Sequence, residues 1–128
     1  MKVSSVDRAQ AKDATASGNF QGRVHIQRLV SAPDDGEIEV LAVYFSRGAR
    51  TKPHVHDVDQ VLHIARGRGI VASETERRSV AVGDVVTIAR GTWHWHGAKR
   101  DSSMMHLSIK RAGAVHWDVD PRDWATDY

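Results

Sequence analysis

Hydrophobic and polar residues alternate in short runs along most of the chain, a pattern typical of half-buried β-strands. The run over 38–48 is instead apolar on both faces, as expected when one face lines a core and the other meets a second sheet or subunit. The run over 79–91 divides into two short strands hinged at a Gly-Asp pair. The predicted strand regions are 20–30, 38–48, 59–73, 79–91 and 103–111.

Turn-forming residues separate these runs. Pro33 and Gly36 mark a turn over 31–37, and 74–78 closes a hairpin. The glycines within 59–73 predict a strand, a turn and the start of the next strand. Many short strands separated by turn signals predict an all-β sandwich or barrel.

The two ends of the chain are less regular. Residues 1–19 are polar and rich in Ala and Ser, which predicts a loosely held arm or one short helix. Asp120 as an N-cap and Pro121 at the first helical position predict a short helix within 119–128. Because 128 residues suffice for one domain but not for two, we expect a single domain over 20–128.

Composition excludes several classes of function. The formal charge is +2, and the basic residues are scattered rather than interleaved with aromatics, so we expect no nucleic-acid partner. The absence of cysteine excludes disulfides, thiolate metal ligands and cysteine nucleophiles, and it fits a reducing compartment. No apolar run reaches membrane-spanning length and the polar start does not resemble a signal peptide, so we expect a cytoplasmic protein without membrane contact.

Histidine is the residue type whose placement carries chemistry. His54 and His56 stand one residue apart, as do His94 and His96, and each pair shares a face if the backbone is extended. Gln60 keeps the parity of the first pair. Imidazole is the commonest metal-binding side chain, and two such pairs in so short a chain indicate a metal site.

Glycines recur at fixed distances from the first histidine pair. Gly48 precedes His54 by six residues, and Gly67 follows Gln60 by seven. This spacing resembles the first conserved motif of the cupin superfamily, with glutamine in place of the motif's glutamate.

The second histidine pair has a similar frame. Gly83 opens this segment and Gly91 precedes His94 by three residues. The spacing resembles the second cupin motif, although Ala89 replaces its proline and Ala98 its asparagine. The two motif regions are 48–67 and 83–98.

The resemblance to cupins implies a jelly-roll β-barrel with a divalent metal ion inside, held by His54, His56, Gln60 and His94. Manganese or iron is the expected ion, with zinc, nickel or cobalt as alternatives. A neutral Gln60 leaves the ion more positive than glutamate would, which favours Lewis-acid chemistry. The alternative is a decayed site in which Gln60 only forms hydrogen bonds.

Within the cupins, the chain is most similar to the small bacterial subgroup that includes cupin-type hydroxynitrile lyases. That similarity implies cleavage or formation of a cyanohydrin, with His106 and His96 as acid/base or substrate-orienting groups, or else as supporting core histidines. The alternatives are an iron or manganese dioxygenase that cleaves a carbon–carbon bond, and a cupin that only binds a small ligand. A small-molecule substrate and a homodimer or homotetramer are the expected partners.

The other histidines and the large apolar residues are expected to be structural. His63 has outward parity, His25 has no assigned role, and His116 should pack a terminal segment. Met104, Met105, Trp93 and Trp95 are expected in the core or the pocket wall.

Overall fold

The computed structural model describes residues 1–32 and 37–126 and confirms the all-β prediction. The elements are η1 (Arg8–Gln10), β1 (Lys12–Asp13), η2 (Thr15–Ser17), β2 (Phe20–Gln21), β3 (Val24–Val30), β4 (Ile38–Phe45), β5 (Arg50–Thr51), β6 (Val55–His56), β7 (Gln60–Ser73), β8 (Arg77–Ala81), β9 (Val85–Ile88), β10 (His94–Ala98), β11 (Met104–Arg111) and β12 (Val115–His116). The predicted turn residues Pro33 and Gly36 lie outside the described residues.

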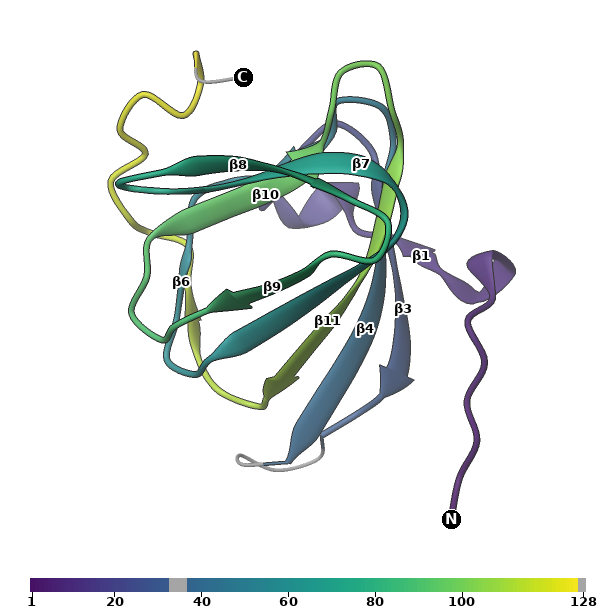
Figure 1. Ribbon diagram of the computed structural model, residues 1–128. Helices are drawn as coiled ribbons and strands as arrows, with labels where there is room; N and C mark the ends of the chain where they lie inside the picture. Colours follow the sequence, from purple (N-terminus) through teal and green to yellow (C-terminus); the bar gives the residue numbers. More distant parts are fainter. Residues whose placement is uncertain (33–36, 127–128) are drawn as a thin grey trace.

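Strand β7 connects the two layers of a curled antiparallel barrel (Figure 1). Its first half pairs with β11 and β9, and its second half pairs with β10 and β8. In Figure 1 one layer contains β3, β4, β11 and β9, and the other contains β8 and β10. The histidines of β10 and of β11 therefore come from opposite layers.

The predicted turn within 59–73 is wrong, because β7 is continuous over 14 residues. Gly67 lies where β7 passes from one layer to the other, with φ 71° and a nearby register shift against β11. A Cβ atom at Gly67 would collide with the carbonyl oxygen of Ser103. Glycine thus lets the strand bend without ending.

The predicted strand over 20–30 is two strands in different layers. β2 pairs with β5, whereas β3 pairs with β4 and β1. Gly22 separates them with φ 84°, and a Cβ there would lie 2.9 Å from the Cα of Ala49. The alternating pattern continues across the break, so it could not reveal the change of partner.

The N-terminal arm is more ordered than predicted. β1 pairs with β3, and the Gln27 side chain accepts a hydrogen bond from the Asp7 N–H (2.9 Å) and donates one to the Ser5 carbonyl (3.0 Å). At the other end, the predicted helix is absent from the described residues. Asp120 accepts a hydrogen bond from the Arg122 N–H, but Arg122 has φ 51°, which stops a helix at its start.

Two apolar clusters fill the structure. The larger lies inside the barrel and includes Phe45, Leu62 and Met104, and the smaller joins Trp93 and Trp95 to Trp124 and Ala72. Met105 is also buried, so the predicted core or pocket-wall placement of Met104, Met105, Trp93 and Trp95 is confirmed. Within the described part of the chain, none of the helices has the length and hydrophobicity needed to cross a bilayer.

Candidate metal centre

Three histidines from two chain segments meet inside the barrel. His54 precedes β6, His56 ends it, and His94 begins β10. The backbones of His54 and His94 exchange two hydrogen bonds, of 3.0 and 3.1 Å, so the segments are fixed against each other. One ring nitrogen from each of the three histidines lies within 4.8 Å of the others. All three side chains are buried, and we call them the histidine cluster.

Backbone carbonyls orient two rings of the histidine cluster. Nδ1 of His54 donates to the Lys52 carbonyl (2.8 Å), and Nδ1 of His94 donates to the Thr92 carbonyl (2.9 Å). Because a carbonyl can only accept, each Nδ1 carries the proton and each Nε2 keeps its lone pair. Nε2 of His94 and both ring nitrogens of His56 are buried without a hydrogen-bond partner. Nε2 of His94 and one nitrogen of the neutral His56 ring therefore offer buried lone pairs, which fit a divalent ion.

Burial keeps the histidine cluster neutral. It lowers the pKa of His54 well below its usual range, with a further contribution from His94. It lowers the pKa of His56 to about 4, with smaller contributions from His94 and Lys110, and it also lowers the pKa of His94. A neutral imidazole is the form that binds a metal ion, so the cluster is ready to coordinate one at neutral pH.

Gln60 begins β7 and is also buried. Its Nε2 donates to the Ser108 hydroxyl (2.9 Å), while its Oε1 is buried without a partner. Ser108 therefore orients the amide with its oxygen left available, which suits a metal ligand. The described contacts do not join Gln60 to a ring of the histidine cluster, so its place as the fourth ligand stays a prediction.

The predicted acid/base residues lie in contact with each other beside this cluster. Nε2 of His106 and Nδ1 of His96 are 3.1 Å apart, and we call these residues the His96–His106 pair. The His96 ring lies 5.6 Å from that of His54 and 5.8 Å from that of His94, between ring centroids. Phe45 packs against both rings of the pair.

The His96–His106 pair is neutral as well. Burial lowers the pKa of His96 well below its usual range and lowers that of His106 to about 4. Nε2 of His96 and Nδ1 of His106 are buried without a hydrogen-bond partner. One N–H can be shared between the two rings, so one outer nitrogen can accept a proton while the other donates one.

A tryptophan near the C-terminus completes the surroundings of the histidine cluster. The Trp117 ring stacks on His54, with ring centroids 4.3 Å apart. The short pairing of β12 with β6 and a 2.8 Å contact between His116 Nε2 and Asp57 hold this segment in place. The sequence analysis missed Trp117, because no spacing rule connects it to a histidine about 60 residues earlier. His116, which was expected to pack a terminal segment, is instead exposed and holds that segment through its contact with Asp57.

Two further histidines do not join the centre. His63 is half-buried on β7, opposite Leu107 and Val85, and points away from the face of Leu62, which is fully buried. His25 is half-buried on β3 opposite Tyr44.

A cavity of about 520 Å³ leads from the surface to His94, between β8, β9 and the second half of β7. Val71, Val80 and Ile88 give it an apolar wall, and Thr92 lies beside His94. Its size suits a small molecule.

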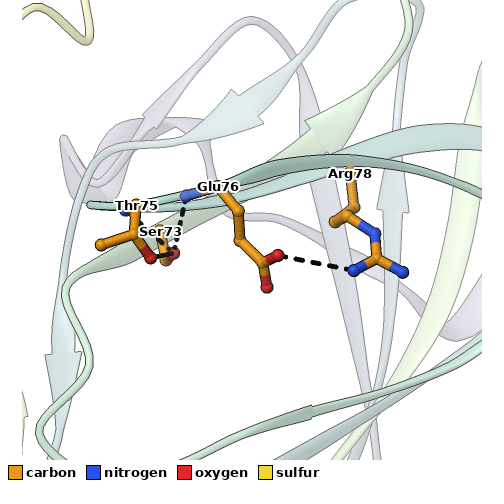
Figure 2. Close-up of polar contacts among 4 residues, drawn as sticks. All are labelled: Ser73, Thr75, Glu76 and Arg78. Carbon is orange, nitrogen blue, oxygen red and sulfur yellow. Dashed lines mark hydrogen bonds and ion pairs between the residues drawn. The ribbon is translucent and has the colours of Figure 1, made fainter.

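The β7–β8 hairpin forms the rim of this cavity. Figure 2 shows its polar network, in which the Ser73 hydroxyl accepts from the Thr75 and Glu76 N–H groups. Glu76 and Arg78 form an exposed 3.4 Å ion pair along the rim.

Fold and site together define a β-barrel protein with a buried three-histidine cluster that can hold a metal ion. Residues 35–110 match the family model for the cupin domain. The chain belongs to the cupin family.

Among curated proteins, the chain is similar to an (R)-mandelonitrile lyase of Granulicella tundricola, with 35% identity over 113 residues that cover 85% of this chain and 86% of the relative. Among solved structures, it is similar to a cupin-like protein from Thermotoga maritima, with 34% identity, a TM-score of 0.75, and coverage of 79% of this chain and 80% of that one. A polyketide cyclase from Streptomyces resistomycificus shares the fold at 17% identity, with a TM-score of 0.77 over 98% of this chain and 94% of that one.

Proposed function

We propose that this cupin is a metal-dependent lyase that cleaves a cyanohydrin into an aldehyde or ketone and hydrogen cyanide. The observation that carries the proposal is the contact of the neutral His96–His106 pair beside the histidine cluster. A metal site with an adjacent proton acceptor is what this reaction needs. The similarity to a mandelonitrile lyase supports the choice of substrate class.

His54, His56 and His94 would hold the ion, with Gln60 as a fourth ligand through its free Oε1. Their buried nitrogens and neutral state fit a divalent cation. When bound, the ion supplies positive charge to the substrate oxygen.

The His96–His106 pair would move the proton. A ring nitrogen of the pair accepts the proton of the substrate hydroxyl, and the electron pair left on oxygen forms the carbonyl double bond. The carbon–cyanide bond breaks with its electron pair on the cyanide carbon. The proton then passes from the pair to cyanide and gives hydrogen cyanide. Phe45 packs against both rings and gives the pair an apolar neighbour.

The first test is cleavage of mandelonitrile by protein loaded with manganese, iron, cobalt or zinc. We expect benzaldehyde release above buffer, followed by its ultraviolet absorbance, with at least one of these ions. His106→Ala should retain the metal and lose about 10²- to 10⁴-fold in rate, the usual share of a proton-transfer group. The control is His63→Ala, which removes a half-buried histidine outside the centre and should retain activity.

Absence of benzaldehyde with every ion would contradict the lyase proposal. Oxygen consumption by the iron-loaded protein would instead indicate an oxygenase. Full activity in His106→Ala would remove this residue from the mechanism.

A further inference from the structure

The interior face of β11 carries a row of three polar residues. His106, Ser108 and Lys110 alternate along the strand and so share one face. His106 is completely buried and Ser108 binds Gln60. Lys110 therefore continues the row on the face that bears the candidate acid/base histidine. Its register partners are Gln60 on β7 and Glu39 on β4.

Lys110 is held in a largely buried ion pair. Its Nζ lies 3.2 Å from Oε1 of Glu39, and only 11% and 16% of the two side chains are exposed. Lysine is seldom buried to this degree unless it is paired. Glu39 also contacts Arg28 through Oε2 at 3.3 Å, so one carboxylate faces two cations and this group keeps a net charge of +1.

The ammonium of Lys110 has hydrogen-bond donors that its ion pair with Glu39 does not use. Its ammonium has three N–H donors, of which the contact with Glu39 occupies one. A positive charge with donors to spare, on the interior face next to Gln60, is the arrangement that binds a small anion.

We propose that Lys110 is an anion-binding residue, which holds one singly charged group of a small substrate or product beside Gln60. Glu39 fixes the ammonium in position. The anion is either a carboxylate on the substrate or the cyanide that the reaction releases. The inference rests on the proposed function only for the cyanide case, since a carboxylate can bind without any lyase activity.

The test compares three probes in calorimetric titrations of the metal-loaded protein. Mandelate carries a carboxylate, mandelamide is its neutral analogue, and cyanide is the small anion. We expect Lys110→Met to weaken the binding of at least one anion about tenfold, the usual effect of losing a charge-assisted hydrogen bond. Lys110→Arg should keep most of that affinity. Mandelamide should bind all variants equally.

Lys12→Met is the matched control, because it removes an exposed lysine on β1 and the same net charge. Thermal melting and metal content establish that each variant is folded and loaded. If Lys110→Met unfolds because Glu39 is left buried, the double variant Glu39→Gln/Lys110→Met removes both charges and takes its place.

If Lys110→Met loses affinity only for mandelate, Lys110 binds a substrate carboxylate. If it loses affinity only for cyanide, Lys110 binds the released anion. Unchanged affinity for both anions in the folded variant would overturn the inference and leave the ion pair a structural one. Lys110-dependent binding of mandelate without mandelonitrile cleavage would contradict the lyase proposal and leave this inference standing.

Discussion

Gln60 stands where the cupin motif has glutamate, and as a fourth ligand it would change the charge of the proposed metal centre. Three neutral imidazoles and a neutral amide leave a divalent ion with its full charge of +2, whereas a carboxylate would reduce it to +1. An amide oxygen is also a weaker ligand than a carboxylate. If Gln60 coordinates the ion as proposed, the site would combine weaker binding of the ion with stronger polarisation of the substrate.

Both effects, on metal affinity and on substrate polarisation, can be tested with Gln60→Glu. We expect the variant to retain metal against a chelator roughly tenfold better, because it adds a charged ligand, and to cleave mandelonitrile more slowly, because the ion becomes less positive. Elemental analysis after dialysis against a chelator measures the first effect, and steady-state kinetics measures the second. His54→Ala serves as the variant that should lose metal. If Gln60→Glu changes neither quantity, Gln60 lies outside the coordination sphere.

At the residue scale, the sequence predicts which residues lie together when they share a motif, but not when only the fold brings them into contact. His54, His56 and His94 could be grouped because the motif spacing carries them together. The contact between His96 and His106 could not be predicted, because β10 and β11 pair with different halves of β7.

At the element scale, the strands that form regular pairs were the easiest to predict. β4 and β11 lie within the predicted regions because neither contains a glycine or proline that could bend or end the strand. The predictions of a turn within β7 and of one strand across β2 and β3 were wrong, because glycine can either bend a strand or end it. Which of these occurs depends on the partner strands, and a single sequence does not name them.

The segment that contains β12 contributes to the candidate metal centre by positioning one aromatic side chain. It has little core of its own, yet it places Trp117 on the ring of His54. Trp117→Ala should therefore weaken metal binding several-fold without removing a ligand, since an aromatic contact contributes about 0.5–1.5 kcal/mol. Trp117→Phe should restore most of the affinity.

Competition with a chromophoric chelator measures these affinities. Val115→Ala is the control, because it alters the same short strand at an exposed position. Equal metal affinity in Trp117→Ala and the parent protein would show that the stack does not orient His54.

At the scale of the whole molecule, the barrel places five buried histidines in one continuous group. His54 and His94 contact His96, which contacts His106, and His56 packs against His54 and His94. Because five titratable side chains are buried together, we expect the stability of the fold in acid to depend on their protonation.

The predicted dimer or tetramer, the absence of nucleic-acid and membrane partners, and the cytoplasmic location remain predictions.

Acid should destabilise the metal-free protein well before its carboxylates titrate. Above pH 6.5 His106 is neutral in both the folded and the unfolded chain, so its stability contribution does not change with pH there. Between about 6.5 and about 4, the unfolded chain binds a proton that the folded chain excludes, so the free energy of unfolding falls as pH falls. For His106 alone the loss approaches about 3 kcal/mol at the lower limit, at about 1.4 kcal/mol per pH unit.

Urea unfolding of the chelator-treated protein at several pH values from 7 to 4.5 measures this dependence. His106→Leu should show a shallower slope, because one of the buried titrating groups is gone, whatever its stability at pH 7. His63→Ala should keep the parent slope, since His63 lies outside the buried group. An unchanged slope in His106→Leu would mean that His106 binds its proton at the same pH in the folded and the unfolded chain, and would contradict the lowered pKa of its buried ring.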